Sequence, residues 1–374
     1  MDYDRGVESH LIEKNCRVDK NLHPSLISTW FRPEIIAMSP YTPGEQPQSG
    51  KVIKLNTNEN PYPPSSRVVE AIASASNRLE RYPDPLGTAF RIAASAALNV
   101  EPEMILCGNG SDDCLTILTR AFVGQQDRLR LPYPSYILYR TLAEIQAAQF
   151  EEVPLSFEYQ LTDAFAAPDP RVKLIYLPNP NSPTGTLIDH ESILSLADRM
   201  PCPIVVDEAY VDFAPMSAVS LVKDNPKIIV TRTLSKSYAL AGLRFGFLVA
   251  HPDIVRTLCK VKDSYNTDAL SLAGATAAIT DQAWLRNNVD KIRQTRDRMT
   301  TSLRGLGFDV LDSHANFVWC TRADRPTKPI YEQLKARGIL VRYMNYPNWS
   351  DGLRISVGTD EQIDALLVVL KDIL

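Results

Sequence analysis

The chain has 374 residues, 44% of them hydrophobic, so it is long enough for one large and one smaller domain with buried cores. The formal net charge is −4 without long runs of one sign, which argues against nucleic acid or an anionic membrane as the main partner. The six cysteines are scattered without a Cys-x-x-Cys pair, and the five histidines show no metal-ligand spacing. We therefore expect a cytoplasmic protein with reduced thiols and no metal site. The N-terminus lacks the apolar core of a signal peptide, and no apolar run approaches membrane-spanning length.

The first part of the chain is predicted to precede the main sheet. Residues 1–33 are polar and weakly periodic and are interpreted as an N-terminal arm. Residues 34–260 are predicted to form a large α/β domain, with 34–50 packing against a small α+β domain of residues 261–374. A serine before the apolar positions that begin at Val68 marks a helix start, and residues 88–98 are predicted to form another helix.

Strands and helices then alternate over about 150 residues, which is typical of a layered α/β domain with a mostly parallel sheet. Most of the predicted strands are short apolar runs, as expected for strands buried on both faces. Strands are expected at 104–107, 128–131, 150–154, 173–177, 203–206, 227–230 and 245–250, and helices at 113–122, 135–147 and 190–200.

The pattern changes beyond residue 252. An apolar stripe from Leu285 to Leu306 has spacings of three, four and seven, and its opposite face is charged, which predicts a long surface helix. Two strands (308–311 and 316–320), a helix (329–337), two strands (339–342 and 353–357) and a closing helix are expected to follow. This order predicts the small α+β domain.

The stretch 231–246 joins a predicted strand to a lone lysine. Lys236 comes just after the strand, with Ser235 before it and small or apolar residues shortly after it. Such a lysine is poised to be desolvated and to act as an amine nucleophile. Ser235 and the forked guanidinium of Arg244 are suited to hold a phosphate, and a lysine with a phosphate cradle suits pyridoxal phosphate. The plainer interpretation is a surface lysine after a strand.

Three further motifs follow predicted strands, where ligands of doubly wound sheets bind. The glycines and free amides of the turn 108–112 suit an anion, or form a simple turn before a helix. Asp207 follows four apolar residues and suits a protonated pyridine nitrogen, or caps a helix. Tyr210 suits a ring oxygen, or is an ordinary amphipathic tyrosine. Residues 179–185, rich in proline and asparagine, form a rigid turn facing the same ligand, or a plain connecting loop.

Together these motifs resemble the fold-type I pyridoxal-phosphate aminotransferases, and among them most closely the histidinol-phosphate aminotransferase family. The resemblance runs from about Phe31 to the C-terminus. It implies a large α/β domain with a mostly parallel, mixed seven-stranded sheet between helices, and a small α+β domain. It rests on Asn-Glu-Asn-Pro at 58–61, Arg-Tyr-Pro-Asp at 81–84, Gly-Asn-Gly-Ser-Asp at 108–112, Pro-Ser-Tyr at 134–136, Pro-Asn-Pro-Asn-Ser-Pro-Thr-Gly at 178–185, Val-Asp-Glu-Ala-Tyr at 206–210, the stretch 233–244 and Gly-Leu-Arg-Ile-Ser-Val-Gly at 352–358.

The resemblance also implies roles for single residues. Lys236 carries the cofactor covalently and serves as the catalytic base and acid, while Asp207 pairs with the pyridine nitrogen. Tyr136 stacks on the ring, and Tyr210 bonds its phenolic oxygen. The residues implied to hold the cofactor's phosphate region are Ser111, Asp112, Ser235 and Arg244.

Two points of the resemblance concern contacts beyond this core. Tyr82 is implied to reach the phosphate of the neighbouring subunit, so that a homodimer completes each site. The commonest form of the family has asparagine immediately before Pro-Thr-Gly, where its amide bonds the ring oxygen. This chain has Ser182 there and Asn181 one position earlier. Either the serine hydroxyl or a shifted Asn181 makes that cofactor contact.

Three residues bear on the substrate. Arg342 and Arg354 lie on successive predicted strands of the small domain, and Tyr41 lies in a turn-rich segment. In the family resembled, the two arginines hold the carboxylate of glutamate or the phosphate of histidinol phosphate in turn, because their fork matches either anion. Arg342 is equally interpretable as a partner in a surface ion pair.

The function implied by the resemblance is amino-group transfer between histidinol phosphate and 2-oxoglutarate in histidine biosynthesis. Alternatives are a threonine-phosphate decarboxylase and a broader, for example aromatic, amino-acid aminotransferase. A remote alternative is a non-catalytic pyridoxal-phosphate-binding regulator, but the arm before Phe31 is short for a winged helix and shows no basic recognition helix. We expect small-molecule substrates, and neither nucleic acid nor membrane as a partner.

Overall fold

A computed structural model describes residues 29–39, 45–46, 52–156 and 158–374. The chain divides into two compact units, Met1–Pro43 and Gly44–Leu374. In the first unit the described residues contain the short helix α2 (Pro33–Ala37). Tyr41, predicted to contact substrate, lies outside the described residues. The predicted boundaries near residues 33 and 260 stay predictions, and the following description concerns the second unit.

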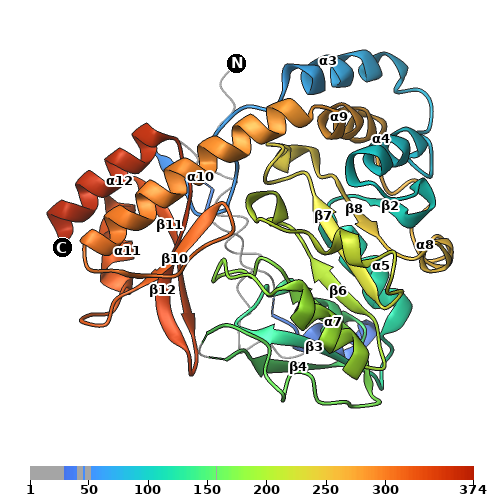
Figure 1. The fold of residues 1–374 in the computed structure, drawn as a ribbon, viewed down its shortest axis with the longest axis horizontal. Coiled ribbons are helices and arrows are strands. Elements are labelled where there is room, and N and C mark those ends of the chain that lie inside the picture. The colour runs from blue at the N-terminus through green and yellow to red at the C-terminus, as the bar shows by residue number, and fades with distance from the viewer. Residues whose placement is uncertain (1–28, 40–44, 47–51, 157) are drawn as a thin grey trace. The chain divides into compact units, whose positions relative to one another are not determined.

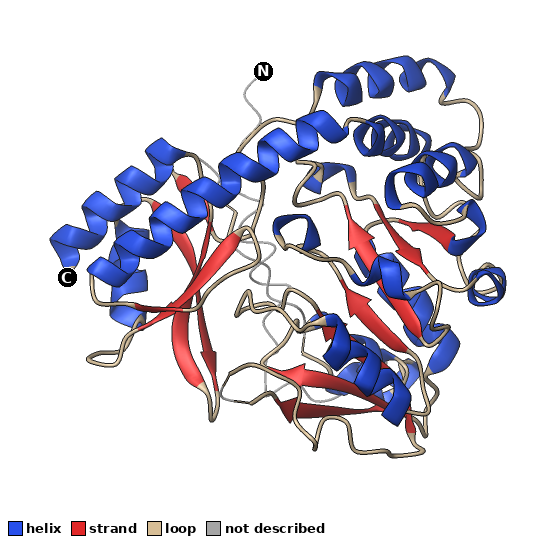
Figure 2. Cartoon of the chain, in the orientation of Figure 1, coloured by secondary structure: helices blue, strands red, loops and turns tan. Residues whose placement is uncertain are grey.

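The larger sheet of this unit has seven strands in the order β2-β8-β7-β6-β5-β3-β4 (Figures 1 and 2). Strand β8 runs antiparallel to both β2 and β7, and the remaining neighbours are parallel. This confirms the predicted α/β fold with a mostly parallel mixed sheet. The strands are β2 (Ile105–Gly108), β3 (Arg128–Tyr133), β4 (Gln149–Pro154), β5 (Val172–Pro178), β6 (Ile204–Asp207), β7 (Ile228–Thr233) and β8 (Gly246–Val249).

Both faces of this sheet are covered, which explains why its central strands β5, β6 and β7 are mostly apolar, whereas β3 and β4 also carry charged residues. Along β6, Val205 belongs to one apolar cluster, and Ile204 and Val206 belong to another. The cluster of Val205 includes side chains of α5 (Ser111–Phe122), α6 (Leu138–Ile145) and α8 (Pro252–Leu258). The second cluster includes side chains of α4 (Thr88–Leu98), α7 (His190–Arg199), α9 (Ala269–Thr280) and α10 (Gln282–Gly305).

The smaller sheet has the strand order β1-β11-β12-β10-β9. Strand β1 pairs in parallel with β11, so a segment far upstream completes a sheet made otherwise of C-terminal strands. The strands are β1 (Ile53–Leu55), β9 (Asp309–Val310), β10 (Phe317–Thr321), β11 (Ile339–Tyr346) and β12 (Ser350–Ser356). Helices α11 (Lys328–Ala336) and α12 (Asp360–Ile373) complete this part of the fold.

Several elements differ from the sequence prediction. The predicted helix 135–147 begins only at Leu138, whereas α5 begins at Ser111, two residues earlier than predicted. Helices α8 and α9 and strand β1 were not predicted. Helix α9 packs against both α3 (Ser66–Ala75) and α4, and it consists largely of small apolar residues. Because it lacks a polar face, its sequence shows no amphipathic helical pattern. Short 3₁₀ turns occur at Ser76–Arg78, Pro102–Met104, Val211–Phe213, Ala218–Leu221 and Ala241–Leu243.

No helix within the described ranges combines the length and apolar composition needed to cross a bilayer.

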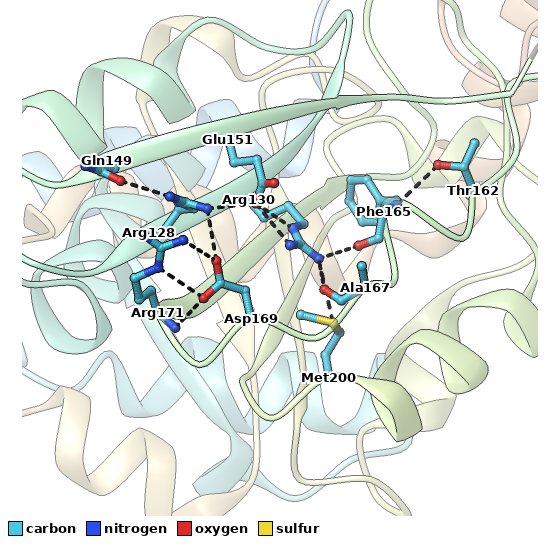
Figure 3. Close-up of polar contacts among 10 residues, drawn as sticks. All are labelled: Arg128, Arg130, Gln149, Glu151, Thr162, Phe165, Ala167, Asp169, Arg171 and Met200. Atoms are coloured by element: carbon cyan, nitrogen blue, oxygen red, sulfur yellow. Dashed lines mark hydrogen bonds and ion pairs between the residues drawn. The ribbon is translucent and has the colours of Figure 1, made fainter.

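A buried arginine on β3 joins β4 to the loop that precedes β5, away from the predicted site. Figure 3 shows Arg130 of β3 between Glu151 of β4 and the loop that precedes β5. Its side chain is nearly inaccessible and donates to the carbonyl groups of Phe165, at 2.7 Å, and Ala167, at 2.6 Å. Its distance to the Glu151 carboxylate is 3.0 Å. One guanidinium therefore pairs with an acid and satisfies two carbonyl groups of the loop.

We expect Arg130→Met to lower the free energy of unfolding by about 2–4 kcal/mol, because a methionine of similar length leaves the Phe165 and Ala167 carbonyls without their donor. Denaturant unfolding measures the difference. Arg171→Met is the matched control, since Arg171 is exposed and pairs with Asp169 at the surface, where such pairs contribute little. Equal losses in the two variants would contradict the structural role of Arg130.

Candidate active site

The predicted catalytic residues meet at the carboxyl ends of two neighbouring strands. Asp207 is the last residue of β6 and lies opposite Thr231 of the parallel strand β7. Strand β7 continues to Thr233, and the chain then turns through Ser235 and Lys236. In a doubly wound sheet, ligands bind at the carboxyl ends of the strands. The topology of β6 and β7 alone therefore brings the Asp207 carboxylate and Lys236 to the same end of the sheet.

Asp207 is a buried carboxylate held by two hydroxyl groups. Its side chain accepts hydrogen bonds from the Tyr139 hydroxyl at 2.7 Å and the Thr231 hydroxyl at 3.1 Å. Burial raises the pKa of Asp207 to about 6, and the two hydrogen bonds oppose that rise. A buried anion is unfavourable without a cationic partner, and the protonated ring nitrogen of the predicted cofactor would be such a partner.

The adjacent carboxylate of Glu208 points into a different environment. It accepts hydrogen bonds from the Ser217 hydroxyl, at 2.7 Å, and from the backbone N–H of Ala218. Burial raises the pKa of Glu208 to about 7, whereas the charge of Arg232 opposes the rise. Of the two acids in the Asp-Glu pair, Glu208 therefore anchors the loop that follows, and Asp207 is the one beside Tyr139 and Thr231.

Lys236 is half-buried next to Tyr210. Its Nζ atom donates to the carbonyl oxygen of Thr57 at 3.2 Å and lies 5.9 Å from the centroid of the Tyr210 ring. The Tyr210 hydroxyl accepts from Asn58 Nδ2 at 3.1 Å, and the ring packs edge-on against Phe317. The lysine and the tyrosine predicted to work together therefore do lie side by side.

The turn before α5 forms a tightly packed helix start. Gly110 has φ +82°, a conformation that favours glycine, and Ser111 is the first helical residue. The first amides of a helix have no partner within the helix and suit an anion. A Cβ atom on Gly246 of β8 would lie only 2.3 Å from the Ser111 nitrogen, so β8 passes directly against this turn.

Arg244 brings its charge to the same helix start. Its Nη1 atom lies 3.4 Å from Ser235 Oγ, and Nη2 lies 3.3 Å from the carboxylate of Asp112. The Tyr136 hydroxyl is 3.5 Å from the other oxygen of Asp112. The residues predicted to hold the phosphate region, together with Tyr136, thus form one connected cluster at the start of α5.

The loop 179–185 presents Asn181 and Ser182 differently. Asn181 Nδ2 donates to the Pro134 carbonyl at 3.3 Å and to Thr184 Oγ1 at 3.0 Å, so its amide nitrogen is engaged near its own loop. Its Oδ1 atom is buried and has no hydrogen-bond partner among the described residues. The Ser182 hydroxyl instead accepts from Arg354 Nη1 at 3.1 Å.

Arg354 connects the small sheet to this loop. Besides Ser182, its guanidinium donates to the Asn56 carbonyl at 3.1 Å and lies over the Phe317 ring. Arg342 of β11 is directly opposite Arg354 in the antiparallel β11–β12 pair, so the two side chains share one face of the sheet. Like charges in this position are unfavourable unless an anion compensates them.

Tyr82 is not joined to this cluster by any hydrogen bond or ring contact within the described part of the chain. Its side chain is 83% exposed, and its ring stacks on that of Tyr265 with centroids 4.6 Å apart.

Sequence reasoning missed several residues that support the site. Asn60 Nδ2 donates to the carbonyls of Lys236, at 2.9 Å, and Ser237, at 3.1 Å, and so fixes the lysine loop. Asn58 contacts Tyr210 and Ser356. Both asparagines belong to the Asn-Glu-Asn-Pro motif, which was a usable signal. Tyr139 gave no such signal in the sequence, since an aromatic residue on an apolar helix face is typical of a hydrophobic core.

The comparisons with known proteins agree with this geometry. Residues 50–370 match the family model described as aminotransferase class I and II, and the chain belongs to that family. A relative from Rhodopirellula baltica, named histidinol-phosphate aminotransferase, is 56% identical over 91% of this chain and 95% of its own. One from Nostoc sp., named histidinol-phosphate aminotransferase 1, is 45% identical over 93% and 99% of the two chains.

Solved structures give the same result. The crystal structure of histidinol-phosphate aminotransferase from Sinorhizobium meliloti, in complex with pyridoxal-5'-phosphate, matches with a TM-score of 0.84 and 25% identity. That match covers 92% of this chain and 98% of the other. An aspartate aminotransferase mutant from Thermus thermophilus, at 19% identity and a TM-score of 0.77, supports the fold alone. These matches confirm the predicted fold-type I class.

The close approach at Gly246 generates a stability prediction. Gly246→Ala places a methyl group against backbone atoms of Gly110, Ser111 and Arg232, none of which yields easily, and overpacking of this kind costs about 1–3 kcal/mol. Denaturant unfolding should show that loss. Gly242→Ala is the control, because no described atom lies within 4 Å of its added methyl group, apart from its chain neighbours and nearby helix backbone. A neutral Gly246→Ala would mean that the helix start moves freely.

Proposed function

We propose that this protein is a pyridoxal-phosphate-dependent aminotransferase that transfers an amino group between histidinol phosphate and 2-oxoglutarate, a step of histidine biosynthesis. One observation carries the reaction class: Lys236, the buried carboxylate of Asp207 and the helix start beside Arg244 lie at one edge of one sheet. The substrate follows from the relatives, because the Rhodopirellula baltica protein named histidinol-phosphate aminotransferase is 56% identical over nearly the full length.

The residues present fit the cofactor. Its phosphate would be held by the amides and hydroxyl of Ser111 together with Ser235 and Arg244, since a helix start and a guanidinium both favour a phosphate. Asp207 would pair with the ring nitrogen. Three buried polar atoms without a partner in the described chain, Ser135 Oγ, Asn181 Oδ1 and Arg354 Nε, occur on the loops and strand that carry the predicted ring and substrate contacts. Tyr136 and Ser182 would flank the ring.

The chain's own residues divide the chemistry among them. When bound, pyridoxal phosphate supplies an electron sink for the pair of electrons left on the substrate Cα. Lys236 Nζ would hold the cofactor until the substrate's amino group takes its place, and the freed amine would then move the proton at the substrate Cα, as base and then as acid. Asp207 keeps the ring nitrogen protonated, because an adjacent anion favours the cationic form of that nitrogen. Tyr210, held by Asn58, hydrogen-bonds the phenolic oxygen.

The two paired arginines support an anionic substrate. Arg342 and Arg354 lie opposite each other on one face of the small sheet, so a phosphate or carboxylate bound there would meet two guanidinium groups. An apolar amino acid offers no anion to these guanidinium groups, so it would lack the charge-assisted hydrogen bonds that a phosphate or carboxylate forms with them. Histidinol phosphate and glutamate each supply an anion, so both half-reactions fit the same pair.

We expect histidinol phosphate to be preferred over histidinol and over phenylalanine by at least about a hundredfold in kcat/KM, the scale of a lost charge-assisted contact. Arg342→Ala should remove most of that preference and harm glutamate less, because the smaller carboxylate relies mainly on Arg354. Arg337→Ala is the control, since Arg337 is an exposed partner of Asp372. Steady-state kinetics with each donor measures these ratios.

Other outcomes of the same assay point to the alternatives. Equal turnover of phenylalanine and histidinol phosphate would make the protein a general aminotransferase. Release of carbon dioxide from phosphothreonine without formation of an oxo acid would make it the decarboxylase. Binding of pyridoxal phosphate at Lys236 with no turnover of any donor would support the regulator.

We also propose that the enzyme is a homodimer whose partner supplies Tyr82. Several large apolar side chains are exposed in the stretch around Tyr82, and exposed apolar surface suits an interface between two copies. The exposed apolar side chains of this stretch are Val69, Leu79, Tyr82, Leu86 and Ile92. The exposed ring of Tyr265 stacks on that of Tyr82.

Mixing two inactive variants tests this arrangement. Lys236→Ala lacks the lysine and Tyr82→Ala lacks the partner contact, so a hybrid dimer has one site with both residues. After subunit exchange at equal amounts, about a quarter of the sites should be intact and active. Mixing Lys236→Ala with Lys236→Arg is the control and should recover nothing. No recovery in the first mixture, despite demonstrated exchange, would place Tyr82 outside the partner's site.

We place the enzyme in the cytoplasm. The five described cysteines are free thiols, and all but Cys259 are buried, which suits a reducing compartment.

A further inference from the structure

The fully buried hydroxyl of Tyr139 has no role in the reaction as described above. Tyr139 lies in the interior of α6, with no exposed surface, and its hydroxyl donates to Asp207 Oδ2 at 2.7 Å. Thr231 of β7 donates to the other oxygen, Oδ1, at 3.1 Å. Each carboxylate oxygen therefore receives one side-chain hydroxyl, and the two hydroxyls come from different elements, while the backbone of Ala209 also donates to the carboxylate.

We propose that Tyr139 is a positioning residue of the aminotransferase: its hydroxyl keeps Asp207 ionised and correctly turned for the ring nitrogen of the cofactor. This inference rests on the proposed function. Tyr139 itself acts only through Asp207. Its hydrogen bond to an ionised group is of the stronger kind, and together with Thr231 it fixes the plane of the carboxylate while leaving further lone pairs for the cofactor.

The neighbouring Tyr176 shows what a merely structural tyrosine looks like in the same place. It is equally buried, and its ring stacks on that of Tyr139, with centroids 4.7 Å apart and an interplanar angle of 22°. Its hydroxyl donates to the Leu115 carbonyl at 2.7 Å and lies 2.6 Å from Thr119 Oγ1, both in α5. The polar requirement of Tyr176 is thus satisfied by a helix, and that of Tyr139 by the catalytic carboxylate.

The charges around Asp207 make its ionisation sensitive to this bond. Burial raises the pKa of Asp207, and the negative charge of Asp112 in α5 raises it too. Cys114 of α5 and Tyr176 of β5 also interact electrostatically with Asp207, and burial raises the pKa of each, so both stay neutral. Tyr139 and Thr231 are the side chains that donate to it, and with both in place the pKa of Asp207 is about 6. Removing the Tyr139 hydroxyl therefore raises it further.

The test uses pyridoxamine 5′-phosphate, which carries an amine in place of the aldehyde and forms no bond to Lys236. Full-length protein freed of cofactor is titrated with this probe by calorimetry between pH 5 and 9. In the unmodified protein, binding should weaken as the pH falls through about 6, because protonated Asp207 must release its proton to hold the protonated ring nitrogen. Tyr139→Phe should move this weakening up by about one to two pH units.

At pH 6 Tyr139→Phe should therefore bind the probe about tenfold more weakly, and at pH 9 as well as the unmodified protein. Tyr176→Phe deletes an equally buried hydroxyl 4.7 Å away by ring centroids and should keep the original pH profile. Titration of the probe's own phosphate affects all three proteins alike and cancels in the comparison.

A Tyr139→Phe profile identical to that of Tyr176→Phe, or one weakened by the same factor at every pH, would overturn the positioning role. If Tyr139→Phe does not fold, Thr231→Val removes the donor to the other oxygen and should shift the profile in the same direction; no shift there would also overturn it. Failure of the unmodified protein to bind the probe at any pH would instead overturn the proposed function.

Discussion

The burial of one carboxylate is the constraint on which the rest of the site depends. Asp207 ends strand β6 only 5% exposed, where an unpaired anion is unfavourable. The fold compensates with hydroxyl donors from α6 and from β7, so the carboxylate holds its place only when both elements are packed against β6. A slip of one residue in β6 would turn Asp207 to the other face of the sheet and bring Glu208 in its place. The chemistry therefore depends on the register of the central strands.

The antiparallel strand β8 connects the central strands to the start of α5, where the predicted phosphate contacts lie. The chain leaves β7, forms the loop that holds Lys236, and returns as β8 between β7 and β2. Gly246 then presses against the turn before α5, and Arg244 comes to lie beside Ser235 and Asp112. Lys236 and Arg244 thus lie on the one connection between β7 and β8. This connection fixes the spacing between the lysine and the cluster at the start of α5.

Residues 56–60, just after β1, join the two sheets around the site. The Asn56 carbonyl accepts from Arg354, Asn58 contacts both Ser356 and Tyr210, and Asn60 holds the carbonyl of Lys236. Since β1 pairs with β11, this segment belongs to the small sheet at one end and to the lysine loop at the other. One short stretch of backbone thereby connects Arg354, a predicted substrate residue, with the residues predicted to hold the cofactor.

The sequence by itself determined the α/β class and the mostly parallel sheet, and it predicted the candidate site residues whose chemistry lies within one contiguous motif, such as Lys236. Strands buried on both faces are continuous apolar runs, and glycine turns restrict the backbone locally, so both leave a mark that is readable without a fold. Only the tertiary structure decided that β1 joins the small sheet, that the apolar stretch 269–280 forms the helix α9, and that the Tyr139 hydroxyl donates to Asp207. Tyr139 and Asp207 are 68 positions apart in sequence, and a buried tyrosine looks the same in the sequence whether its hydroxyl meets a backbone carbonyl or a catalytic acid. That choice is made by the packing of α6 on the sheet, because a hydrogen-bond partner depends on distance in space and leaves no periodic trace along the chain.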